Sequence, residues 1–485
     1  MPQLIYKSFI NGKWLESSEK AQLKSPFSGE KLSLVSMATP ENLEIAIQAA
    51  HDVSLGFRKN SRYMRSRVLG LMAAEIEMRR KDFIKKMIEE AGKPFLFAEM
   101  EVNRAIQSFT IASEEAKRFG GEVIPLDIDA SGRAYAPAIS YWFARGPILA
   151  ITPFNFPLNL VAHKVAPALA VGCPILLKPS PQAPGCAYLL AEIFEKAIRQ
   201  ASDTKENILA ACFQVLNCSN EILSKAVRDP RLSTLSFTGS GKVGWELQGQ
   251  AIGKKIALEL GGNAAVIVHS DSDILRAAQR CATGGYGYAG QSCISVQRIF
   301  VHTKVKDEFT NALLKETAKI KTGDPNDKDT SVGPVIDENA AERIMKWIDE
   351  AKAEGAKVLT GGTREKNLIQ PTILTQVKAT SKVSCEEVFA PIVLIQEYQD
   401  FSEALDLVNA SKFGLQVGVF TQNSELQYQA LQNLEVGGVI ANDIPTYRAD
   451  NMPYGGVKSS GLGREGIRFA MEEFSERRSL ISWIG

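Results

Sequence analysis

One cysteine of the chain lies in a setting that suits a nucleophile. The run Gly290-Gln291-Ser292-Cys293 follows further glycines at positions 284, 285 and 287, which would let the backbone approach a ligand closely. A thiol attacks an electrophilic carbon as the thiolate, so Cys293 needs a nearby base or an electropositive niche. Because a free cysteine is more often a small buried hydrophobe, the interpretation depends on what else the chain supplies.

The chain supplies one well-placed candidate base. Glu259 ends an apolar run and is followed by Leu260, Gly261 and Gly262, a setting in which burial can raise the pKa of a carboxyl group. A solvated glutamate at a strand end is the alternative. No histidine stands in a pattern typical of Cys-His hydrolases; the four are His51, His163, His269 and His302.

A turn bounded by prolines offers a hydrogen-bond donor. In Pro153-Phe154-Asn155-Phe156-Pro157 the two prolines restrict the backbone and leave the Asn155 amide free to point outward. If an electrophilic carbonyl binds next to Cys293, this amide and the Cys293 backbone N–H could form an oxyanion hole. Otherwise Asn155 is a structural turn residue.

A glycine-rich turn indicates a nucleotide site. The apolar run Leu235–Phe237 leads into Gly239-Ser240-Gly241-Lys242-Val243-Gly244, with a helix expected to start near Lys242. The glycines would let the backbone approach a pyrophosphate, and the helix N-terminus would add partial positive charge. In the ordinary dinucleotide motif an acid about 20 residues further on binds the ribose, and here it would be Glu259. Because Glu259 is already the candidate base, this is not an ordinary dinucleotide fingerprint.

Two α/β lobes are needed to position these groups. Short buried apolar runs alternate with amphipathic segments from Pro147 onward, and the alternation resumes after residue 265. Strands separated by helices of this length form right-handed βαβ units, so we expect two open, Rossmann-like parallel sheets with ligands at the C-terminal ends of their strands. The expected strands include 148–151, 175–178, 235–237, 266–268, 299–301, 393–398, 417–421 and 439–442.

The bulk properties narrow the range of partners. The 485 residues exceed the roughly 250 to 300 at which a single core stops growing. A net charge of +1 offers no field for nucleic acid or anionic lipid, and no apolar run reaches the roughly 20 residues of a membrane helix. Seven irregularly spaced cysteines indicate free thiols in a reducing compartment. We therefore expect a cytoplasmic protein that binds small molecules, with no nucleic-acid, membrane or metal partner.

Taken together, the motifs resemble the aldehyde dehydrogenase superfamily over nearly the whole chain. The resemblance implies NAD- or NADP-dependent oxidation of a small aldehyde to the carboxylic acid. Cys293 would form a thiohemiacetal and then a thioester, Asn155 would stabilise the oxyanion, and Glu259 would activate water for hydrolysis. Besides the clusters above, it rests on Ile10-Asn11-Gly12-Lys13-Trp14, Val332-Gly333-Pro334, Glu387-Val388-Phe389-Ala390-Pro391, Pro453-Tyr454-Gly455-Gly456-Val457-Lys458 and Ser460-Gly461-Leu462-Gly463-Arg464-Glu465.

The resemblance also implies roles for neighbouring residues. Lys164 and Glu476 match positions of a proton relay to the general base. Lys178 would contact the adenosine ribose, whereas Glu387 and Phe389 would contact the nicotinamide ribose. The remaining expected cofactor contacts are Thr152, Pro153, Phe154, Ser180, Pro181, Gly239, Ser240, Gly244 and Leu260.

The family fold implies three structural units and an assembly of subunits. Residues 1–121 and 145–261 would form the cofactor-binding domain, and residues 262–470 the catalytic domain. Residues 122–144 and 471–485 would form a small β oligomerisation element that crosses to a neighbouring subunit. A homodimer or homotetramer is expected from the resemblance.

Two features bear on specificity. Strongly NAD-preferring members commonly carry a glutamate three positions after the ribose-contacting lysine, and its carboxylate would repel the 2′-phosphate of NADP. Here that position is Pro181, so dual use of NAD and NADP is expected. The segment Asn442–Arg448 resembles the branch that handles lactaldehyde, semialdehydes and phosphonoacetaldehyde. Arg104, His163 and Arg448 are placed on the substrate channel, where they favour a small aldehyde with a hydroxyl or acid group. For Arg104 a solvated surface position is the alternative.

Two other functions remain open on the sequence alone. An acylating enzyme of the same fold would release the thioester to coenzyme A, although a positioned base has an obvious use only if water is the acceptor. A catalytically silent binding or structural member of the fold is the second alternative.

Overall fold

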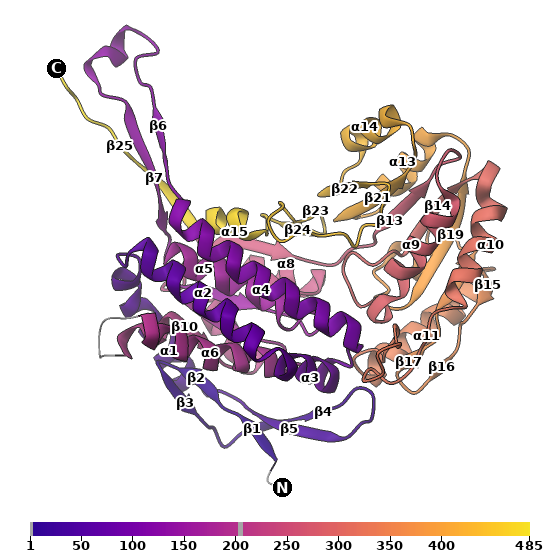
Figure 1. Cartoon of the computed structure of the whole chain (residues 1–485), viewed down its shortest axis with the longest axis horizontal. Helices are drawn as coiled ribbons and strands as arrows, with labels where there is room; N and C mark the ends of the chain where they lie inside the picture. Colours follow the sequence, from indigo (N-terminus) through magenta and orange to yellow (C-terminus); the bar gives the residue numbers. More distant parts are fainter. Residues whose placement is uncertain (1–2, 202–206) are drawn as a thin grey trace.

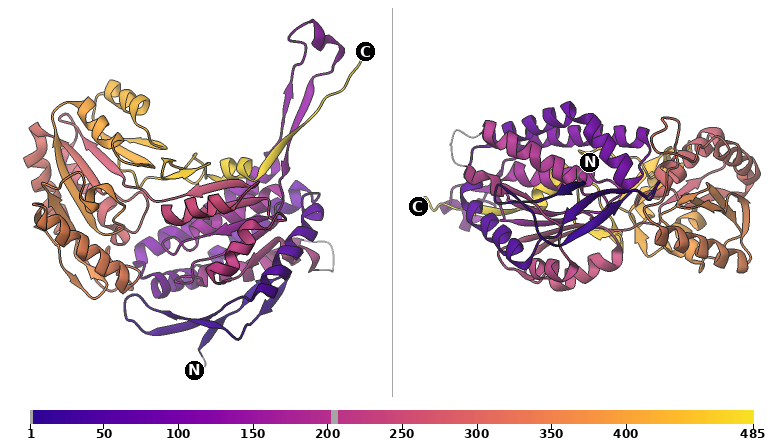
Figure 2. Two further views of the ribbon diagram at one scale, coloured as in Figure 1. Left: turned by 180° about the vertical axis from the view of Figure 1, so that it is seen from behind. Right: turned by 90° about the horizontal axis from the view of Figure 1, so that it is seen from below.

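The chain forms two α/β lobes and a projecting arm (Figure 1). The computed structural model describes residues 3–201 and 207–485. The first lobe, in indigo and magenta, and the second lobe, mainly in orange, lie side by side in both further views of the molecule (Figure 2). The arm leaves the first lobe and carries the C-terminus of the chain.

An eight-stranded sheet forms the centre of the first lobe. Its five central strands are parallel. Helices cover both faces, which explains why the central strands are continuous apolar runs rather than alternating ones. In spatial order the strands are β24 (Gly461–Leu462), β12 (Lys255–Glu259), β11 (Thr234–Thr238), β8 (Ile148–Ile151), β9 (Ile175–Lys178), β10 (Phe213–Val215), β2 (Ser8–Ile10) and β3 (Lys13–Leu15). Strand β24 at one edge and β2 near the other edge pair antiparallel with the central strands, and the edge strand β3 pairs antiparallel with β2.

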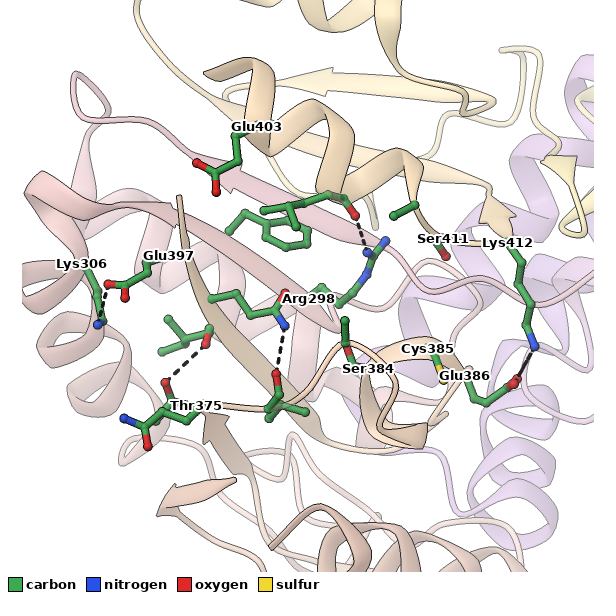
Figure 3. A pocket seen from close by; sticks show the side chains of 18 residues that line it. Arg298, Lys306, Thr375, Ser384, Cys385, Glu386, Glu397, Glu403, Ser411 and Lys412 are labelled. Atoms are coloured by element: carbon green, nitrogen blue, oxygen red, sulfur yellow. Dashed lines mark hydrogen bonds and ion pairs between the residues drawn. The ribbon is translucent and has the colours of Figure 1, made fainter. Parts of the chain in front are cut away.

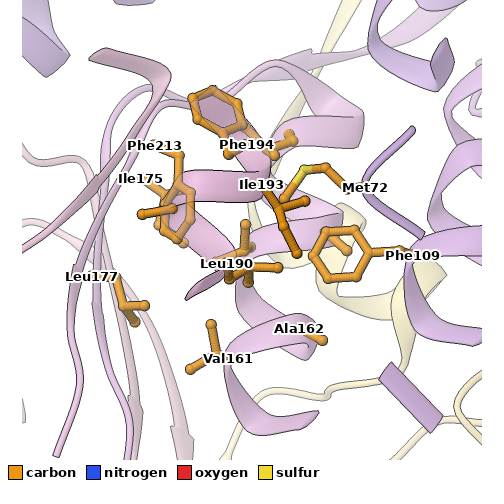
Figure 4. Packing of buried hydrophobic residues seen from close by; sticks show 14 of the residues in the cluster. Met72, Phe109, Val161, Ala162, Ile175, Leu177, Leu190, Ile193, Phe194 and Phe213 are labelled. Atoms are coloured by element: carbon orange, nitrogen blue, oxygen red, sulfur yellow. The ribbon is translucent and has the colours of Figure 1, made fainter. Parts of the chain in front are cut away.

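The core of this lobe lies between the sheet and its helices. Figure 4 shows Phe109, Leu190 and Phe213 converging there from two helices and one strand. Each large apolar side chain buried in this way stabilises the fold by about 1.5–3 kcal/mol. The helices on this side are α2 (Arg62–Met78), α3 (Arg80–Ala91), α4 (Phe95–Arg118), α5 (Asn159–Val171) and α6 (Gly185–Ala201), and those on the other face are α1 (Pro40–Phe57), α7 (Asn220–Arg228) and α8 (Gly241–Gln250).

A seven-stranded sheet forms the centre of the second lobe. All its strands are parallel except the edge strand β15. In spatial order they are β15 (Lys357–Thr360), β18 (Thr372–Thr375), β19 (Ile392–Tyr398), β14 (Arg298–His302), β13 (Ala265–Val268), β21 (Gln416–Phe420) and β22 (Gly438–Ala441). The helices α9 (Ile274–Tyr286), α10 (Lys306–Thr317) and α11 (Glu338–Ala353) pack in one core cluster, and α13 (Phe401–Asn409) and α14 (Ser424–Asn433) in another.

The arm is a three-stranded antiparallel sheet. The strands β6 (Glu122–Ile124) and β25 (Ser475–Leu480) flank β7 (Ala138–Ala144), so the C-terminal tail pairs with the hairpin-like stretch as expected. Apolar side chains cover much of its surface, with Ile128 87% and Trp483 71% exposed. Such a surface is unusual for a part of a protein that faces only water.

The chain returns to the first lobe before its end. Strand β24 pairs with β12, and helix α15 (Ile467–Glu473) packs into the core of the first lobe. The expected catalytic segment 262–470 is therefore too long at its C-terminal end, because the glycine-rich stretch around β24 gave no apolar pattern from which a crossing could be predicted. A small sheet of β1 (Leu4–Tyr6), β5 (Lys31–Ser36) and β4 (Lys20–Lys24) and the short elements α12 (Lys382–Cys385), β16 (Arg364–Glu365), β17 (Leu368–Ile369), β20 (Phe413–Gly414) and β23 (Val457–Lys458) complete the lobes.

Within the described ranges, the structure contains no helix that combines the length and the apolar character needed to cross a membrane.

Candidate active site

A cavity of about 1000 Å³ is lined by residues of both lobes. It contains the predicted nucleophile Cys293, the candidate base Glu259 and the Asn155 amide. Asn155 and Glu259 reach it because β8 and β12 are parallel strands whose C-terminal ends meet at one edge of the sheet. The other predicted residues on its wall are Arg104, Pro153, Phe154, Gly239, Ser240, Leu260, Glu387, Phe389 and Arg448.

Several predicted residues lie outside the wall of this cavity. Lys178 is the last residue of β9, Ser180 and Pro181 follow this strand, and Thr152 donates its backbone N–H to the Lys178 carbonyl at 3.3 Å. These four residues therefore lie at the same edge of the sheet as Asn155 and Glu259, but outside the wall of the cavity that contains the thiol. Gly244, His163, Lys164 and Glu476 also lie outside the wall.

A strained turn presents Cys293. The φ angles of Tyr288, Ala289 and Gly290 are 52°, 55° and 66°, in the left-handed region that costs a non-glycine residue about 1–2 kcal/mol. A Cβ on Gly290 would lie 2.1 Å from the Ala390 carbonyl oxygen, so only glycine fits this position. The turn therefore fixes the backbone directly before the nucleophile.

The thiol of Cys293 is protonated in this arrangement. Burial raises its pKa to about 12, although a hydrogen bond with Tyr454 lowers it. The Cys293 Sγ lies 3.1 Å from the Tyr454 hydroxyl oxygen, and the side chain keeps part of its surface accessible. Attack on a substrate thus requires that the proton be removed at that step.

Asn155 holds its amide next to the nucleophile segment. Its Nδ2 donates to the carbonyl oxygen of Gln291, two residues before Cys293, at 3.1 Å. An amide carries two N–H donors, so one remains for an oxyanion. The Gln291 side chain is itself fixed, since its Oε1 accepts from the Ile336 N–H at 3.0 Å and its Nε2 donates to the Pro334 carbonyl at 3.2 Å.

Glu259 has the properties of a base that is neutral at rest. Burial, followed by the charge of Glu465, raises its pKa well above the usual range, and the cations Arg448 and Lys164 do not cancel this effect. Among the described residues, its Oε2 has no hydrogen-bond partner. A Cβ on Gly455 would lie 2.9 Å from Glu259 Oε1, so the glycine turn leaves room for the carboxyl group.

Lys164 contacts Glu465 rather than Glu476. Its Nζ lies 3.0 Å from Glu465 Oε1 and 2.9 Å from Ser236 Oγ. Burial raises the pKa of Glu465, but Lys164 and Arg448 outweigh it and lower the pKa below its usual range. Glu476 lies on the arm strand β25, where it pairs with Arg478 and comes within 3.9 Å of Arg145. Of the two residues expected in the proton relay, only Lys164 therefore lies beside the carboxyl groups of Glu465 and Glu259.

The partner of Lys164, Glu465, lies in a motif already singled out in the sequence. Glu465 ends the run Gly463-Arg464-Glu465, which was recognised only as a family motif. Its backbone forms a bridge with Tyr454, and this bridge brings two distant motif residues to the cavity together.

The two arginines predicted to contact the substrate each form an ion pair with a carboxylate. Arg104 Nη2 lies 2.6 Å from Asp450 Oδ1, and Arg448 Nη2 lies 3.1 Å from Glu465 Oε2. Among the described residues, the Nε atoms of Arg104 and Arg448 are buried without a hydrogen-bond partner. Both arginines line the cavity, so they keep hydrogen-bonding capacity for a ligand.

His163 does not line the channel. Its ring is fully buried, and its Nε2 lies 2.7 Å from Asp450 Oδ1. Burial, then the charge of Arg448, lowers the pKa of His163, so its neutral form supports the Asp450 carboxylate. The expectation for His163 is wrong because every residue of α5 is buried. Nothing in the sequence pattern distinguished Asp450.

The first turn of α8 fits the phosphates of a dinucleotide. The helix begins at Gly241 after the N-cap Ser240, whose side chain makes no capping hydrogen bond, so the first backbone N–H groups remain available for an anion. A Cβ on Gly244 would lie 2.3 Å from the Leu260 side chain, and one on Gly239 would lie 2.6 Å from the Phe237 ring.

Glu387 and Phe389 fit the nicotinamide end of the cofactor. Glu387 Oε1 accepts from the Gly262 N–H at 2.9 Å, and burial raises the pKa of this carboxyl to about 7. The Phe389 ring packs edge to face on Phe154 with 6.1 Å between ring centres. A carboxylate that accepts hydrogen bonds beside an aromatic wall suits a ribose hydroxyl and its attached ring.

A second cavity of about 760 Å³ lies in the second lobe, and several charged side chains that line it pair with one another (Figure 3). Lys306 pairs with Glu397 at 2.7 Å, and Lys412 pairs with Glu386 at 2.6 Å. Arg298 donates to the Leu407 carbonyl at 3.1 Å. None of the predicted site residues lines this cavity, so the chemistry belongs to the larger one.

Comparisons with known proteins agree with the geometry. A 3-sulfolactaldehyde dehydrogenase of Priestia aryabhattai is 39% identical over 479 residues, 98% of each chain. The structure of an aldehyde dehydrogenase of Physcomitrella patens in complex with the reaction product succinate has a TM-score of 0.95 and 38% identity, and covers 100% of this chain and 99% of that one. A glyceraldehyde-3-phosphate dehydrogenase of Methanocaldococcus jannaschii complexed with NADP has a TM-score of 0.91 and 36% identity, over 96% of this chain and 100% of that one.

These structures also confirm the expected α/β class with parallel sheets. The profile of the aldehyde dehydrogenase family matches residues 14–480. The chain therefore belongs to the aldehyde dehydrogenase family and is an NAD(P)-dependent oxidoreductase that acts on the aldehyde group.

Proposed function

We propose that Cys293 is the nucleophile of this dehydrogenase. Its Sγ bonds to the aldehyde carbon, the carbonyl π bond opens onto oxygen, and the thiol proton leaves to a base. The observation that supports this role is the convergence of thiol, amide and carboxyl group on one cavity that also fits the dinucleotide. Cys293 is the one cysteine on the wall of that cavity among the described residues.

Asn155 and Glu259 serve successive steps of the proposed reaction. The free Asn155 N–H and the Cys293 backbone N–H stabilise the oxyanion of the thiohemiacetal. A nicotinamide bound beside Glu387 and Phe389 would supply the hydride acceptor that oxidation of the thiohemiacetal to the thioester requires. Glu259, once it has given up its own proton, then removes a proton from water, which attacks the thioester carbon and displaces the Cys293 thiolate. The position of Glu259 on the cavity wall and its buried oxygen without a hydrogen-bond partner among the described residues support this role.

Lys164 and Glu465 form the proton relay to Glu259 in this scheme. Both residues lie near enough to shift the pKa of Glu259 in opposite directions, and they contact each other at 3.0 Å. A proton gained by Glu259 can therefore pass into a buried network instead of returning to the thiol. Glu476 has no part in this relay, because it lies on the arm strand β25 and contacts Arg145 and Arg478 instead.

The proposed substrate is a small polar aldehyde that carries a hydroxyl or acid group. Near the substrate end of the cavity, the three cations Arg104, Arg448 and Lys164 share the two carboxylates of Asp450 and Glu465, and Glu259 is neutral at rest. The remaining positive charge favours an anion. Three similar proteins are named for sulfolactaldehyde, for glyceraldehyde 3-phosphate, and for a complex with succinate.

We propose that the enzyme accepts both NAD and NADP. Pro181 is exposed and places no carboxylate beside the ribose site, and Lys178 and Ser180 lie three positions and one position before it. A similar protein binds NADP. The charge difference between a proline and a glutamate at this position is the physical basis of the proposal.

The arm is proposed to join two copies of the chain, as a homodimer or as half of a homotetramer. Its exposed apolar side chains support a second copy as the partner, because isolated strands with such a surface tend to aggregate. We also place the protein in the cytoplasm, since all seven cysteines are free thiols.

The test of the proposed function compares two cysteine variants. Cys293→Ala abolishes the formation of reduced cofactor with every aldehyde of a panel, whereas Cys385→Ala, which changes the other partly exposed cysteine, retains it. Cofactor binding, measured by fluorescence, is unchanged in both variants. The same assays with and without coenzyme A separate hydrolysis from acyl transfer. Retention of more than a trace of activity in Cys293→Ala contradicts the proposal.

A further inference from the structure

The hydroxyl group of Tyr454 is held beside the nucleophile by a rigid frame. The Tyr454 N–H donates to the Glu465 carbonyl at 3.0 Å, and the Glu465 N–H donates back at 2.6 Å. The ring is buried against Ile294 and Leu415, and the Arg448 guanidinium lies 3.7 Å from the ring centre. The 3.1 Å contact between the Tyr454 hydroxyl and Cys293 Sγ is thus fixed from three sides.

This hydroxyl group remains protonated and only partly used. Burial raises the pKa of Tyr454 well above its usual value, and the nearby Arg448 cation does not offset it. Cys293 is its one hydrogen-bond partner among the described residues. A phenol has one donor and also accepts, so it can bind a second polar group while it stays beside the sulfur.

The other polar groups of the cavity are placed to bind other parts of the substrate. The Asn155 amide lies next to Gln291, where the oxygen of the attacked carbonyl would sit. The side chains of Arg104 and Arg448 line the cavity and are anchored on Asp450 and Glu465, so their guanidinium groups are placed for a distal charged group. None of these groups contacts the thiol. Tyr454 alone among the described residues combines a free hydrogen-bonding capacity with contact to Cys293 Sγ.

We propose that Tyr454 is a specificity-determining residue that binds a hydroxyl group on C2, the carbon next to the aldehyde. The proposal rests on the proposed function, because it takes Cys293 as the atom that bonds to C1. Once that bond exists, the C2 oxygen is separated from Sγ by only two carbon atoms, and a gauche arrangement brings it beside the sulfur. A hydroxyl group fixed beside Sγ therefore reaches an oxygen on C2 but not one on C3.

The enzyme accordingly selects 2-hydroxyaldehydes over their 2-deoxy analogues. A buried hydrogen bond between neutral groups contributes about 0.5–1.5 kcal/mol, and a donor left without its partner costs more. We expect a preference of roughly tenfold in kcat/KM for 2-hydroxypropanal over propanal, which corresponds to about 1.4 kcal/mol. An aldehyde with an additional acid group gains a separate increment from the arginines.

The test uses Tyr454→Phe and two aldehydes that differ only in the C2 hydroxyl group. In Tyr454→Phe the preference for 2-hydroxypropanal over propanal falls to about one, through loss of efficiency with 2-hydroxypropanal, while kcat/KM for propanal stays within roughly threefold. Tyr447→Phe, which removes the hydroxyl of another tyrosine on the cavity wall, leaves the preference in place. A thermal unfolding curve like that of the wild type shows that the variant folds.

Two results overturn the proposal. Equal losses with both aldehydes assign Tyr454 to positioning of the thiol, and a matching change in the rate at which iodoacetamide alkylates Cys293 supports that assignment. Absence of any C2 preference in the wild type also excludes it. Failure of the proposed function looks different, because a wild-type enzyme that oxidises no aldehyde of either kind contradicts the Cys293 mechanism itself.

Discussion

Lys164 and Glu465 form a buried ion pair, with 3.0 Å between Nζ and Oε1, although 301 positions separate them along the chain. The pair joins helix α5 of the first lobe to the segment that follows strand β24. It also sets the electrostatic environment of Glu259, since both members shift the pKa of that carboxyl.

Glu465→Gln is expected to slow deacylation, whereas Glu476→Gln is not. Loss of the Glu465 charge leaves Lys164 and Arg448 without their shared carboxylate and removes the proton acceptor beyond Glu259. We expect a burst of reduced cofactor followed by a steady state that is slower by roughly 10²-fold, the lower range for acid–base groups. Rapid mixing with cofactor absorbance measures both phases. Equal effects of the two substitutions would restore the original assignment of Glu476.

Asn155→Ala is expected to lower kcat by roughly 10²- to 10³-fold, which is the usual effect of one lost oxyanion donor. The affinity for cofactor should remain unchanged, because the amide contacts Gln291 and not the dinucleotide surface. Asn155→Asp keeps the size of the side chain but removes its N–H donors, so it should show at least the same loss. A decrease below tenfold makes Asn155 a turn residue.

Pro181→Glu is expected to penalise NADP selectively. Two like charges about 4 Å apart near a protein surface repel each other by more than about 1.4 kcal/mol, so kcat/KM for NADP should fall by at least roughly tenfold. The efficiency with NAD should change little. Pro181→Gln, which removes the proline without adding charge, is the matched control. A wild-type preference for NAD above roughly 100-fold, or equal effects on both cofactors, refutes dual use.

Cofactor binding is expected to depend on pH through Glu387. Burial raises the pKa of this carboxyl to about 7, while the Gly262 N–H and Arg343 act in the opposite direction. Below that pH the group is protonated and accepts hydrogen bonds less well, so the Kd for NAD should fall as pH rises through 7 and then level off. In Glu387→Gln the Kd should be higher and independent of pH. Fluorescence titrations check this, and an identical pH profile in the variant contradicts it.

The combined substitutions Ile128→Asp and Trp483→Asp are expected to yield monomers. These side chains are 87% and 71% exposed on the arm, and a buried carboxylate at an interface is strongly unfavourable. Leu275→Asp, at a residue that is 71% exposed on α9, controls for added surface charge. Light scattering gives the molecular mass. A wild-type chain that is already monomeric excludes the proposed assembly.

The parallel strands could be predicted closely from the sequence because they are buried on both faces. Ile148–Ile151 and Ile175–Lys178 were predicted with their observed bounds, since such strands are short, continuous apolar runs between turn residues. The position of β24 in the first sheet could not be predicted, because Gly461 and Leu462 form no apolar pattern and join this sheet through backbone pairing with β12.

The positions of the chemical groups were predicted better than their partners. Cys293, Glu259 and Asn155 each lie in a local motif; two strand ends bring Glu259 and Asn155 to the cavity, and a strained turn brings Cys293 there. The contacts of Lys164 and His163 with Glu465 and Asp450 arise from long-range packing, which no local spacing encodes. For Tyr454 the sequence indicated only membership of a family motif. Its contact with the thiol could not be predicted, because it depends on the backbone bridge to Glu465.

The return of the chain to the first lobe has a consequence for biosynthesis. Most of the first lobe and the thiol-bearing turn precede Tyr454, Glu465 and the arm strand β25 along the chain, so they leave the ribosome first. Domains fold in order during synthesis, so the nascent chain can form most of the first sheet early. It lacks its proton relay and the tyrosine beside the thiol until these later residues have been added. A chain that terminates before Tyr454 therefore carries the thiol without the groups that surround it in the finished cavity.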